Sequence, residues 1–277
     1  MKPVAFDCVR ARSLQEASQL LAQAEGDAKI VAGSQSLGPM LNLRLVRPRL
    51  LVDVTGIAEM TQVEEGDGFV TLGACITTAS IEDGRAPGRG FPALAAVAAN
   101  IAYRAVRNRG TIGGSICHAD PAADWLSALC GLGAQCLISG FGGSRDLPVD
   151  KFVTGAFETA LGPAEILPGI RIPRPSSKAR WGYSKVCRKA GEFAMAIGAV
   201  LDDPERDILR MVIGATRGKP IVVTNARMLT RRSGVASHEL DEEAVLRLLD
   251  EHKVIDHASR RQHVAVLRRA LLQAGTP

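Results

Sequence analysis

The sequence predicts an α+β protein, in which strands and helices follow one another without the regular alternation of a doubly wound sheet. Short apolar runs of strand character are mixed irregularly with segments of helical periodicity along the 277 residues. Residues 173–177, Pro-Arg-Pro-Ser-Ser, break both periods and indicate a linker before a smaller C-terminal part. We therefore expect three parts, formed by residues 1–55, 56–175 and 176–277.

The first part, residues 1–55, is predicted to form a β-α-β-β unit. Ser13 and Glu16 have the spacing of a capping box, and Gly26 follows the helix as its stop signal. The apolar stripe of this helix consists of Leu14, Ala17, Leu20 and Leu21. The predicted strands are residues 3–8, 29–32 and 50–54.

The second part, residues 56–175, mixes short strands with short helices. The predicted strands are residues 61–65, 69–72, 73–75, 134–139 and 165–172, with a turn at 66–68 and another at 145–148. The predicted helices are residues 78–82, 92–100, 103–107 and a segment that begins at residue 124.

The third part, residues 176–277, is predicted to be a three-stranded antiparallel sheet followed by helices. The expected strands are residues 181–187, 194–201 and 207–215, and the expected helices are residues 239–250 and 257–274. Residues 196–200 are small and apolar, which is typical of a buried central strand.

Two glycine-rich segments each lie beside an apolar element. Residues 110–114 read Gly-Thr-Ile-Gly-Gly, and Gly113-Gly114 predicts a turn with φ > 0 whose amides form a nest for an anion. Residues 33–36, Gly-Ser-Gln-Ser, stand between a predicted strand and a segment of helical spacing, which is a phosphate-binding arrangement. One such loop also fits a plain tight turn. Two loops could hold the two halves of a pyrophosphate.

Three segments together resemble the FAD-binding medium subunits of molybdenum hydroxylases, the xanthine dehydrogenase and carbon monoxide dehydrogenase group. Residues 32–37 (Ala-Gly-Ser-Gln-Ser-Leu) are similar to the first flavin loop, residues 111–124 to the second, and residues 183–194 to a third signature. The segments have the order and spacing of the family across essentially the whole chain. Ser34 and Ser115 depart from the usual Gly and Asn, and both replacements are small.

The resemblance implies a two-part FAD-binding domain of the PCMH type, followed by a C-terminal domain. It implies that Lys185 reaches the FAD, that Phe193 packs on the isoalloxazine, and that Asp124 contacts the cofactor. We expect Asp120 to cap or brace the loop instead. The cofactor-binding residues that it assigns are Ala32, Gly33, Ser34, Gln35, Ser36, Leu37, Thr111, Ile112, Gly113, Gly114, Ser115, His118, Asp124, Ile166, Leu167, Lys185 and Phe193.

Plainer interpretations of four of these residues stay open at this point. Lys185 would also fit a solvated basic strand edge, and Phe193 would fit a core position. His118 has no partner residues that suggest a catalytic triad or a metal site, so it fits a structural loop position. Asp124 stands in a segment that also reads as the start of a helix.

The resemblance also implies partners. Iron–sulfur clusters and a molybdopterin cofactor are expected in a small and a large partner subunit, as a dimer of heterotrimers, with FAD in this chain passing electrons to an external acceptor. The six cysteines are irregularly spaced, with no C-x-x-C pair, which argues against a metal cluster here. We find no acid/base, catalytic or metal-binding constellation. A self-contained FAD-dependent reductase and a non-redox nucleotide-binding module remain alternatives.

Composition limits the other functions. The net charge is only +5 and aromatic residues make up 4%, without a basic segment interleaved with aromatics, so we expect no nucleic-acid partner. The N-terminus lacks the apolar core of a secretory signal, and no apolar stretch reaches the length of a membrane helix. We therefore expect a cytoplasmic protein. The organic substrate and the acceptor, whether NAD, a quinone, oxygen or another, stay undetermined.

Overall fold

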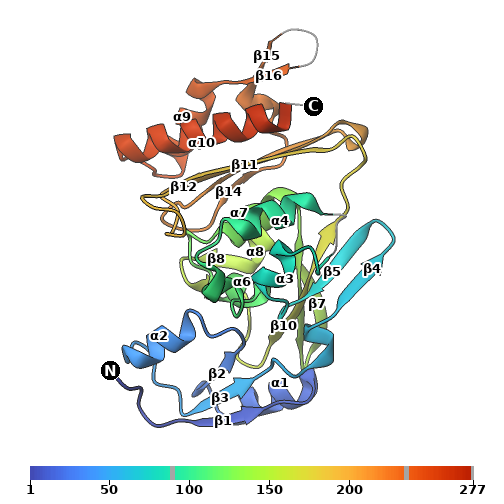
Figure 1. Cartoon of the computed structure of the whole chain (residues 1–277). Helices are drawn as coiled ribbons and strands as arrows, with labels where there is room; N and C mark the ends of the chain where they lie inside the picture. Colours follow the sequence, from blue (N-terminus) through green and yellow to red (C-terminus); the bar gives the residue numbers. More distant parts are fainter. Residues whose placement is uncertain (88–90, 234–236, 276–277) are drawn as a thin grey trace.

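Three main β-sheets follow one another along the long axis of the molecule, in the order of the sequence (Figure 1). The structure is a computed structural model and describes residues 1–87, 91–233 and 237–275. It combines separate sheets with helices between them, which confirms the predicted α+β class.

The first sheet is parallel, with the strand order β1-β3-β2. Its elements are β1 (Asp7–Arg10), α1 (Leu14–Gln23), β2 (Ala28–Val31), α2 (Leu37–Asn42) and β3 (Leu50–Asp53). The Ser13 hydroxyl accepts a hydrogen bond of 3.1 Å from the Glu16 amide, which confirms the predicted helix start. The first strand was predicted to begin at residue 3, but it begins at Asp7.

The second sheet is antiparallel, with the order β4-β5-β10-β6-β7. Its strands are β4 (Val63–Gly66), β5 (Phe69–Gly73), β6 (Gln135–Gly140), β7 (Gly143–Pro148) and β10 (Ile166–Pro173). Two predictions are wrong here. The expected strand at residues 73–75 ends at Gly73, and the expected turn at 145–148 belongs to β7.

Six helices and a small hairpin accompany the second sheet in the described part of the chain. They are α3 (Thr78–Glu82), α4 (Pro92–Ala99), α5 (Arg104–Arg107), α6 (Ile112–His118), α7 (Asp124–Leu132), α8 (Val149–Phe152), β8 (Val153–Gly155) and β9 (Glu158–Thr159). One continuous apolar core runs from α1 through the second sheet to α7. The described residues also contain the 3₁₀ turns η1 (Ala58–Met60), η2 (Pro204–Arg206) and η3 (Ala226–Leu229).

The third sheet contains the three predicted strands and one more. Its antiparallel order is β11-β12-β13-β14, from β11 (Arg180–Val186), β12 (Ala196–Asp203), β13 (Ile208–Gly214) and β14 (Ile221–Val223). A hairpin of β15 (Thr230–Ser233) and β16 (Ser237–Leu240) precedes α9 (Glu242–Glu251) and α10 (His257–Gly275). The predicted helix start at residue 239 is wrong because the Asp241 side chain caps α9 at the Ala244 amide.

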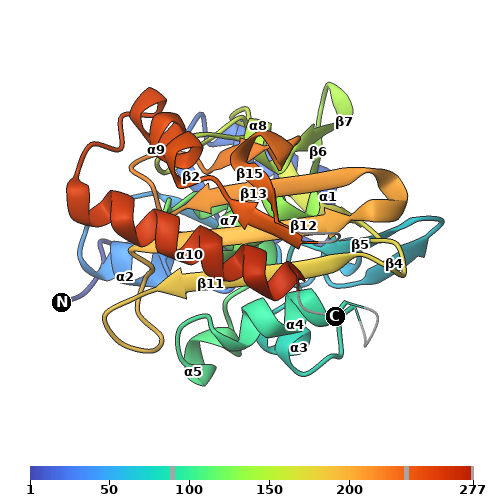
Figure 2. The ribbon, with the colours of Figure 1, turned by 90° about the horizontal axis from the view of Figure 1, so that it is seen from above.

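The third sheet lies between α10 on one side and α7 on the other (Figures 1 and 2). Glycines allow both helices to approach the sheet closely. A Cβ at Gly182 would overlap the carbonyl oxygen of Ala270 in α10, and a Cβ at Gly214 would overlap the Ser127 hydroxyl in α7. Because α7 also belongs to the core beneath the second sheet, the C-terminal part is packed firmly against the rest of the chain.

Candidate cofactor-binding site

The two glycine segments lie against each other. A Cβ at Gly33 would overlap the carbonyl oxygen of Arg109 and would lie 2.9 Å from the Gly110 Cα atom. A Cβ at Gly110 would in turn lie 3.7 Å from Cγ of Gln35. Only glycine allows this approach, so the first segment and the start of the second form one continuous surface.

The first segment presents a run of unpaired backbone donors. The amide groups of residues 33–37 have no hydrogen-bond acceptor within the described chain. Ser34 has a φ of +60°, and the Gln35 side-chain amide donates to the Gly33 carbonyl at 2.9 Å. Ser36 precedes α2 without a capping hydrogen bond. Successive amides at a helix start favour an anion such as phosphate.

The second segment is a capped helix start instead of a turn. The first three amides of α6 donate to the Ile76 carbonyl, the Ala74 carbonyl and the Thr111 hydroxyl at 2.9–3.0 Å. Neither Gly113 nor Gly114 has a positive φ, so the predicted left-handed turn is wrong. Gly114 is exposed and Ser115 half-buried, so this segment offers a small surface that another group can approach closely.

Gly113 is required for packing inside the protein. A Cβ at this position would overlap the Ala74 side chain. Ala74 donates its amide to the Pro168 carbonyl at 2.9 Å, in the irregular stretch of β10 between Ile166 and Gly169. The structure thus places Ala74, and behind it the stretch of β10 around Pro168, against the second glycine segment.

The side chains of Ile166 and Leu167 are both buried in the core. Any contact that these residues make with a ligand would therefore come from their backbone. Sequence position alone could not indicate this, because burial depends on the neighbouring strands.

Asp124, Tyr183 and Lys185 form a buried polar cluster between α7 and β11. The Lys185 ammonium lies 2.9 Å from the Asp124 carboxylate and donates to the Asn100 carbonyl at 2.7 Å. The Tyr183 hydroxyl donates to the same carboxylate at 2.7 Å. The side chains of Asp124 and Lys185 are only 7% and 10% exposed. Lys185 is therefore not a solvated strand edge.

Tyr183 belongs to this cluster, although its type and position in the sequence did not indicate so. Burial, followed by the nearby Asp124 charge, raises the pKa of Tyr183 well above its ordinary value, so its hydroxyl stays protonated and donates. The alternation of side chains along β11 is the signal that could have indicated Tyr183, because Tyr183 and Lys185 are two residues apart and therefore share one face of the strand.

The loop between β11 and β12 carries Phe193 at the surface, with 65% of the residue exposed. Gly191 in this loop has a φ of +84°, and a Cβ there would lie 3.0 Å from the Tyr103 ring and 3.1 Å from the Ala102 carbonyl oxygen. Tyr103 is itself 62% exposed. Two accessible aromatic side chains thus stand on adjoining loops, and Phe193 is not a core residue.

His118 and Asp120 have structural contacts. The His118 ring lies 5.2 Å from the Phe157 ring, at the end of α6. The Asp120 carboxylate accepts a hydrogen bond of 2.9 Å from the Ala122 amide, as expected of a residue that braces its loop.

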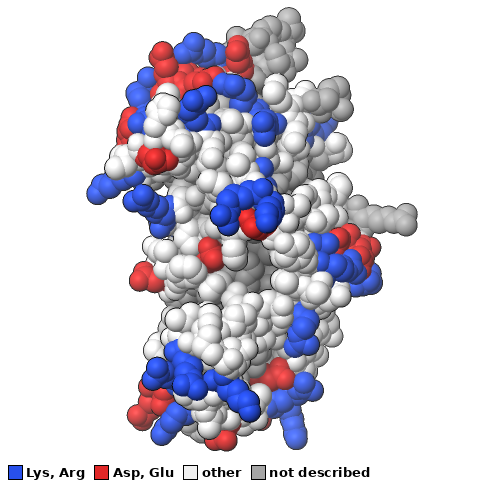
Figure 3. Space-filling view, turned by 60° about the vertical axis from the view of Figure 1, so that its left-hand side comes forward, with Lys and Arg blue, Asp and Glu red and all other residues white. Residues whose placement is uncertain are grey.

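The face that contains the junction between the first and second parts is hollowed, and the side chains around the hollow are mostly uncharged (Figure 3). The first part lies below the hollow and the second part above it, and these parts supply the two glycine segments. Among the described residues there is no group of three potential metal ligands and no helix of a length and hydrophobicity that could cross a membrane.

Comparison with known proteins supports a flavin-binding assignment. The family described as "FAD binding domain in molybdopterin dehydrogenase" matches residues 4–175. The nicotine 6-hydroxylase medium subunit of Paenarthrobacter nicotinovorans is 31% identical and covers 99% of both chains. The caffeine dehydrogenase subunit beta of Pseudomonas sp. (strain CBB1) is 35% identical over 80% of this chain and 76% of its own.

A solved structure agrees over nearly the whole length. A chain of carbon monoxide dehydrogenase from Hydrogenophaga pseudoflava superimposes with a TM-score of 0.87 at 29% identity, covering 99% of this chain and 98% of that one. The match therefore includes the C-terminal part, beyond the residues that the family profile covers. From the profile, the relatives and the fold together, the chain belongs to the family of FAD-binding domains of molybdopterin dehydrogenases.

Proposed function

We propose that this chain is the FAD-carrying electron-transfer subunit of a molybdenum-containing hydroxylase or dehydrogenase. In this role it takes electrons from the iron–sulfur clusters of a partner subunit and passes them to an external acceptor. The observation that carries the proposal is the run of unpaired amides at residues 33–37, held against the second glycine segment by Gly33. Membership of an oxidoreductase flavin-binding family supports it.

The residues present fit FAD. The amides of residues 33–37 would hold its anionic phosphate groups, and the exposed Gly114 leaves room for close approach. The buried pair of Lys185 and Asp124 brings no net charge to the site, and the exposed ring of Phe193 would offer a stacking surface. A bound flavin would supply one- and two-electron redox chemistry, while the protein supplies binding, orientation and electrostatics. We therefore assign no general base to this chain.

We further propose that the partners are a small iron–sulfur subunit and a large molybdopterin subunit, assembled as a dimer of heterotrimers. The related proteins from Paenarthrobacter and Pseudomonas are named as subunits, which supports a multi-subunit complex. The organic substrate would then bind on another chain.

The test compares this chain alone with the chain co-expressed with its neighbouring gene products. We expect acid precipitation of the isolated chain to release yellow FAD, since its binding is proposed to be non-covalent. The isolated chain should pass electrons from chemically reduced flavin to a dye but should not oxidise heterocycles, aldehydes or carbon monoxide. Substrate turnover by the isolated chain at the rate of the complex would contradict the subunit proposal.

A further inference from the structure

The short helix α5 connects the two ends of the candidate site. At its C-terminal end, the Gly110 amide donates to the Val106 carbonyl at 2.7 Å, and the Arg109 amide donates to the same carbonyl at 3.1 Å. The backbone of these two residues is the surface against which Gly33 packs. The position of α5 therefore determines where the first glycine segment lies.

At the N-terminal end of α5, the chain contacts the C-terminal part. The Ala102 carbonyl and the Tyr103 ring lie against Gly191, in the loop between β11 and β12. The Asn100 carbonyl accepts a hydrogen bond from Lys185. Movement of residues 100–103 would thus change both the surface loop and the partners of the buried lysine.

Arg107 holds this N-terminal end with four hydrogen bonds. Its Nε and Nη2 atoms donate to the two carboxylate oxygens of Glu82 at 2.8 and 2.9 Å. Its Nη1 atom donates to the Ile101 and Ala102 carbonyls at 2.8 and 2.9 Å. Ala102 has a φ of +45°, a conformation that is costly for alanine and needs support from its surroundings. The Arg107 side chain is only 11% exposed.

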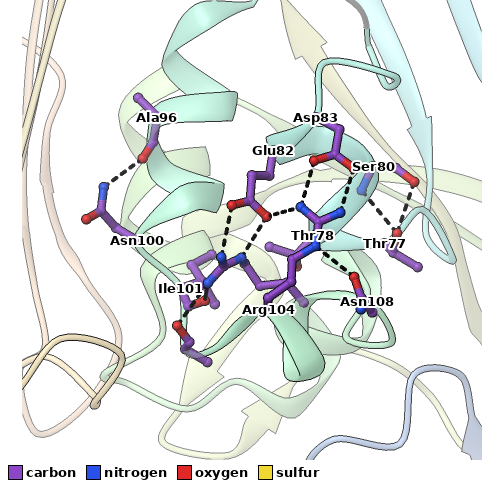
Figure 4. A network of polar contacts seen from close by, with 12 residues as sticks. Thr77, Thr78, Ser80, Glu82, Asp83, Ala96, Asn100, Ile101, Arg104 and Asn108 are labelled. Carbon is purple, nitrogen blue, oxygen red and sulfur yellow. Dashed lines mark hydrogen bonds and ion pairs between the residues drawn. The ribbon is translucent and has the colours of Figure 1, made fainter.

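The position of Glu82 depends on the second glycine segment. Glu82 is the last residue of α3, and the first residue of α3, Thr78, donates its amide to the Gly110 carbonyl at 2.8 Å. Hydrogen bonding from Arg107 lowers the pKa of Glu82, so the carboxylate is charged at neutral pH. Arg104 and Asp83 extend this network on the outer side, where Arg104 also bonds to Asn108 (Figure 4).

We propose that Arg107 is a positioning residue for the FAD site. Through Glu82 and the two carbonyls it holds residues 100–103, and thereby sets where Lys185 and the Phe193 loop stand relative to the glycine segments. The proposal rests on FAD binding by this chain and on the place of Lys185 in the site. It does not depend on electron transfer to or from any partner.

The experiment measures FAD binding to the FAD-depleted full chain by flavin fluorescence, together with the visible spectrum of the bound flavin and the melting temperature. The variants are Arg107→Gln, Arg107→Lys and, as a matched control, Arg104→Gln. Arg104 makes three hydrogen bonds to carboxylates, two to Asp83 and one to Glu82, against two for Arg107. It is 47% exposed and does not touch the carbonyls of residues 101 and 102, so the variant tests the loss of a Glu82 contact without the loss of those carbonyl contacts. Arg107→Lys keeps the charge and can still bond to Glu82.

We expect Arg107→Gln to raise the dissociation constant for FAD by about tenfold or more, because an uncharged glutamine amide, with two donors, cannot make the four hydrogen bonds of the Arg107 guanidinium. Its flavin spectrum should shift, Arg107→Lys should be intermediate, and Arg104→Gln should bind like wild type even if its melting temperature falls as far. Equal affinity and identical spectra for Arg107→Gln and Arg104→Gln would overturn the proposal. If only Arg107→Lys can be purified, an FAD affinity equal to that of the wild type in this variant would overturn the proposal.

Failure of this proposal can be told apart from failure of the proposed function. A wild-type chain that binds FAD while the Arg107 variants bind it equally well removes the positioning role and leaves the electron-transfer proposal untouched. A wild-type chain that binds FAD and also turns over substrate alone removes the subunit proposal and leaves the role of Arg107 open to the same measurement.

Discussion

The two glycine segments of this chain look alike in sequence and differ in what their glycines do. In the first, the five backbone amides of residues 33–37 have no acceptor among the described residues and stand beside a six-residue helix. In the second, the first three amides of α6 are all satisfied within the protein. Gly113 serves packing against Ala74, and only Gly114 is exposed. The first segment is therefore rich in donors, and the second contributes shape.

The two segments show that a glycine in a loop of this kind can serve more than one structural purpose. Glycine can permit a left-handed backbone, the approach of a ligand, or the approach of another part of the same chain. In the first segment the left-handed residue is Ser34, not a glycine. In the second, the glycines have ordinary helical backbone.

The largest effect is expected for Gly33→Ala. The new Cβ would overlap the Arg109 carbonyl and separate the two segments, lowering the free energy of unfolding by about 3 kcal/mol. FAD retention should be lost as well. Gly198→Ala is the control, because its Cβ would lie 2.7 Å from the backbone of α10, far from this junction. Thermal unfolding and flavin content of both variants check this. A folded Gly33→Ala chain that retains FAD would contradict the claim that FAD binding requires the close packing of the two glycine segments.

Gly114→Val should affect the cofactor more than the fold. Gly114 is exposed, so a valine would fill surface near the junction and abolish FAD retention. Its Cβ would also lie 2.8 Å from the Thr111 hydroxyl that caps α6, so we expect a loss of stability of about 1 kcal/mol beside the loss of FAD. Gly142→Val is the control for a valine at an exposed glycine, since a Cβ there meets nothing within 4 Å, and Thr111→Val is the control for the disturbed cap. Flavin content after gel filtration decides the matter. Full occupancy with an unchanged spectrum would show that the second segment does not face the cofactor.

Thr111→Val should destabilise the chain by about 1 kcal/mol, because it removes the cap of α6. The affinity for FAD should change less than twofold if the second segment contributes shape and not donors. Ser13→Ala removes a cap of the same kind from α1 and should cost a similar amount. Chemical unfolding gives the first quantity and a fluorescence titration the second. A large loss of FAD affinity in Thr111→Val would argue that this hydroxyl binds the cofactor.

Ser34→Gly should give the smallest effect, a stabilisation of about 0.5 kcal/mol, because glycine tolerates a positive φ better than serine. Ala119→Gly, at a φ of +52° where α6 ends, should give a similar gain. Only Ser34→Gly should also change FAD affinity. Chemical denaturation measures the gain in stability, as a shift of the midpoint when the denaturant dependence (m-value) of the variant equals that of the wild type. A destabilised Ser34→Gly chain would mean that the serine side chain contributes something beyond its backbone conformation.

Features set by local sequence were predictable. Ser13 caps α1 through a bond that spans three residues, and the strands of the third sheet follow from alternation and small apolar residues. The extra strand β14 was missed because three residues are too few to show a period. The general α+β order followed from the same local signals.

Features set by distant contacts could not be predicted without the fold. Whether Gly113 starts a turn or a helix depends on Ala74, and whether Lys185 is solvated depends on Asp124 in another part of the chain. The family resemblance indicated that Lys185 and Asp124 belong to one site, but not that they form an ion pair. The supporting pair of Arg107 and Glu82 left no sequence signal, because a carboxylate and a guanidinium 25 residues apart are common on protein surfaces.

The most direct test of this account is amide hydrogen exchange at single-residue resolution, with and without FAD. In the FAD-depleted chain, the amides of residues 33–37 should exchange rapidly and those of residues 112–114 slowly, because only the latter are hydrogen-bonded. Added FAD should strongly protect residues 33–37 and leave residues 112–114 almost unchanged. Protection that appears at residues 112–114 while residues 33–37 continue to exchange freely would contradict the account.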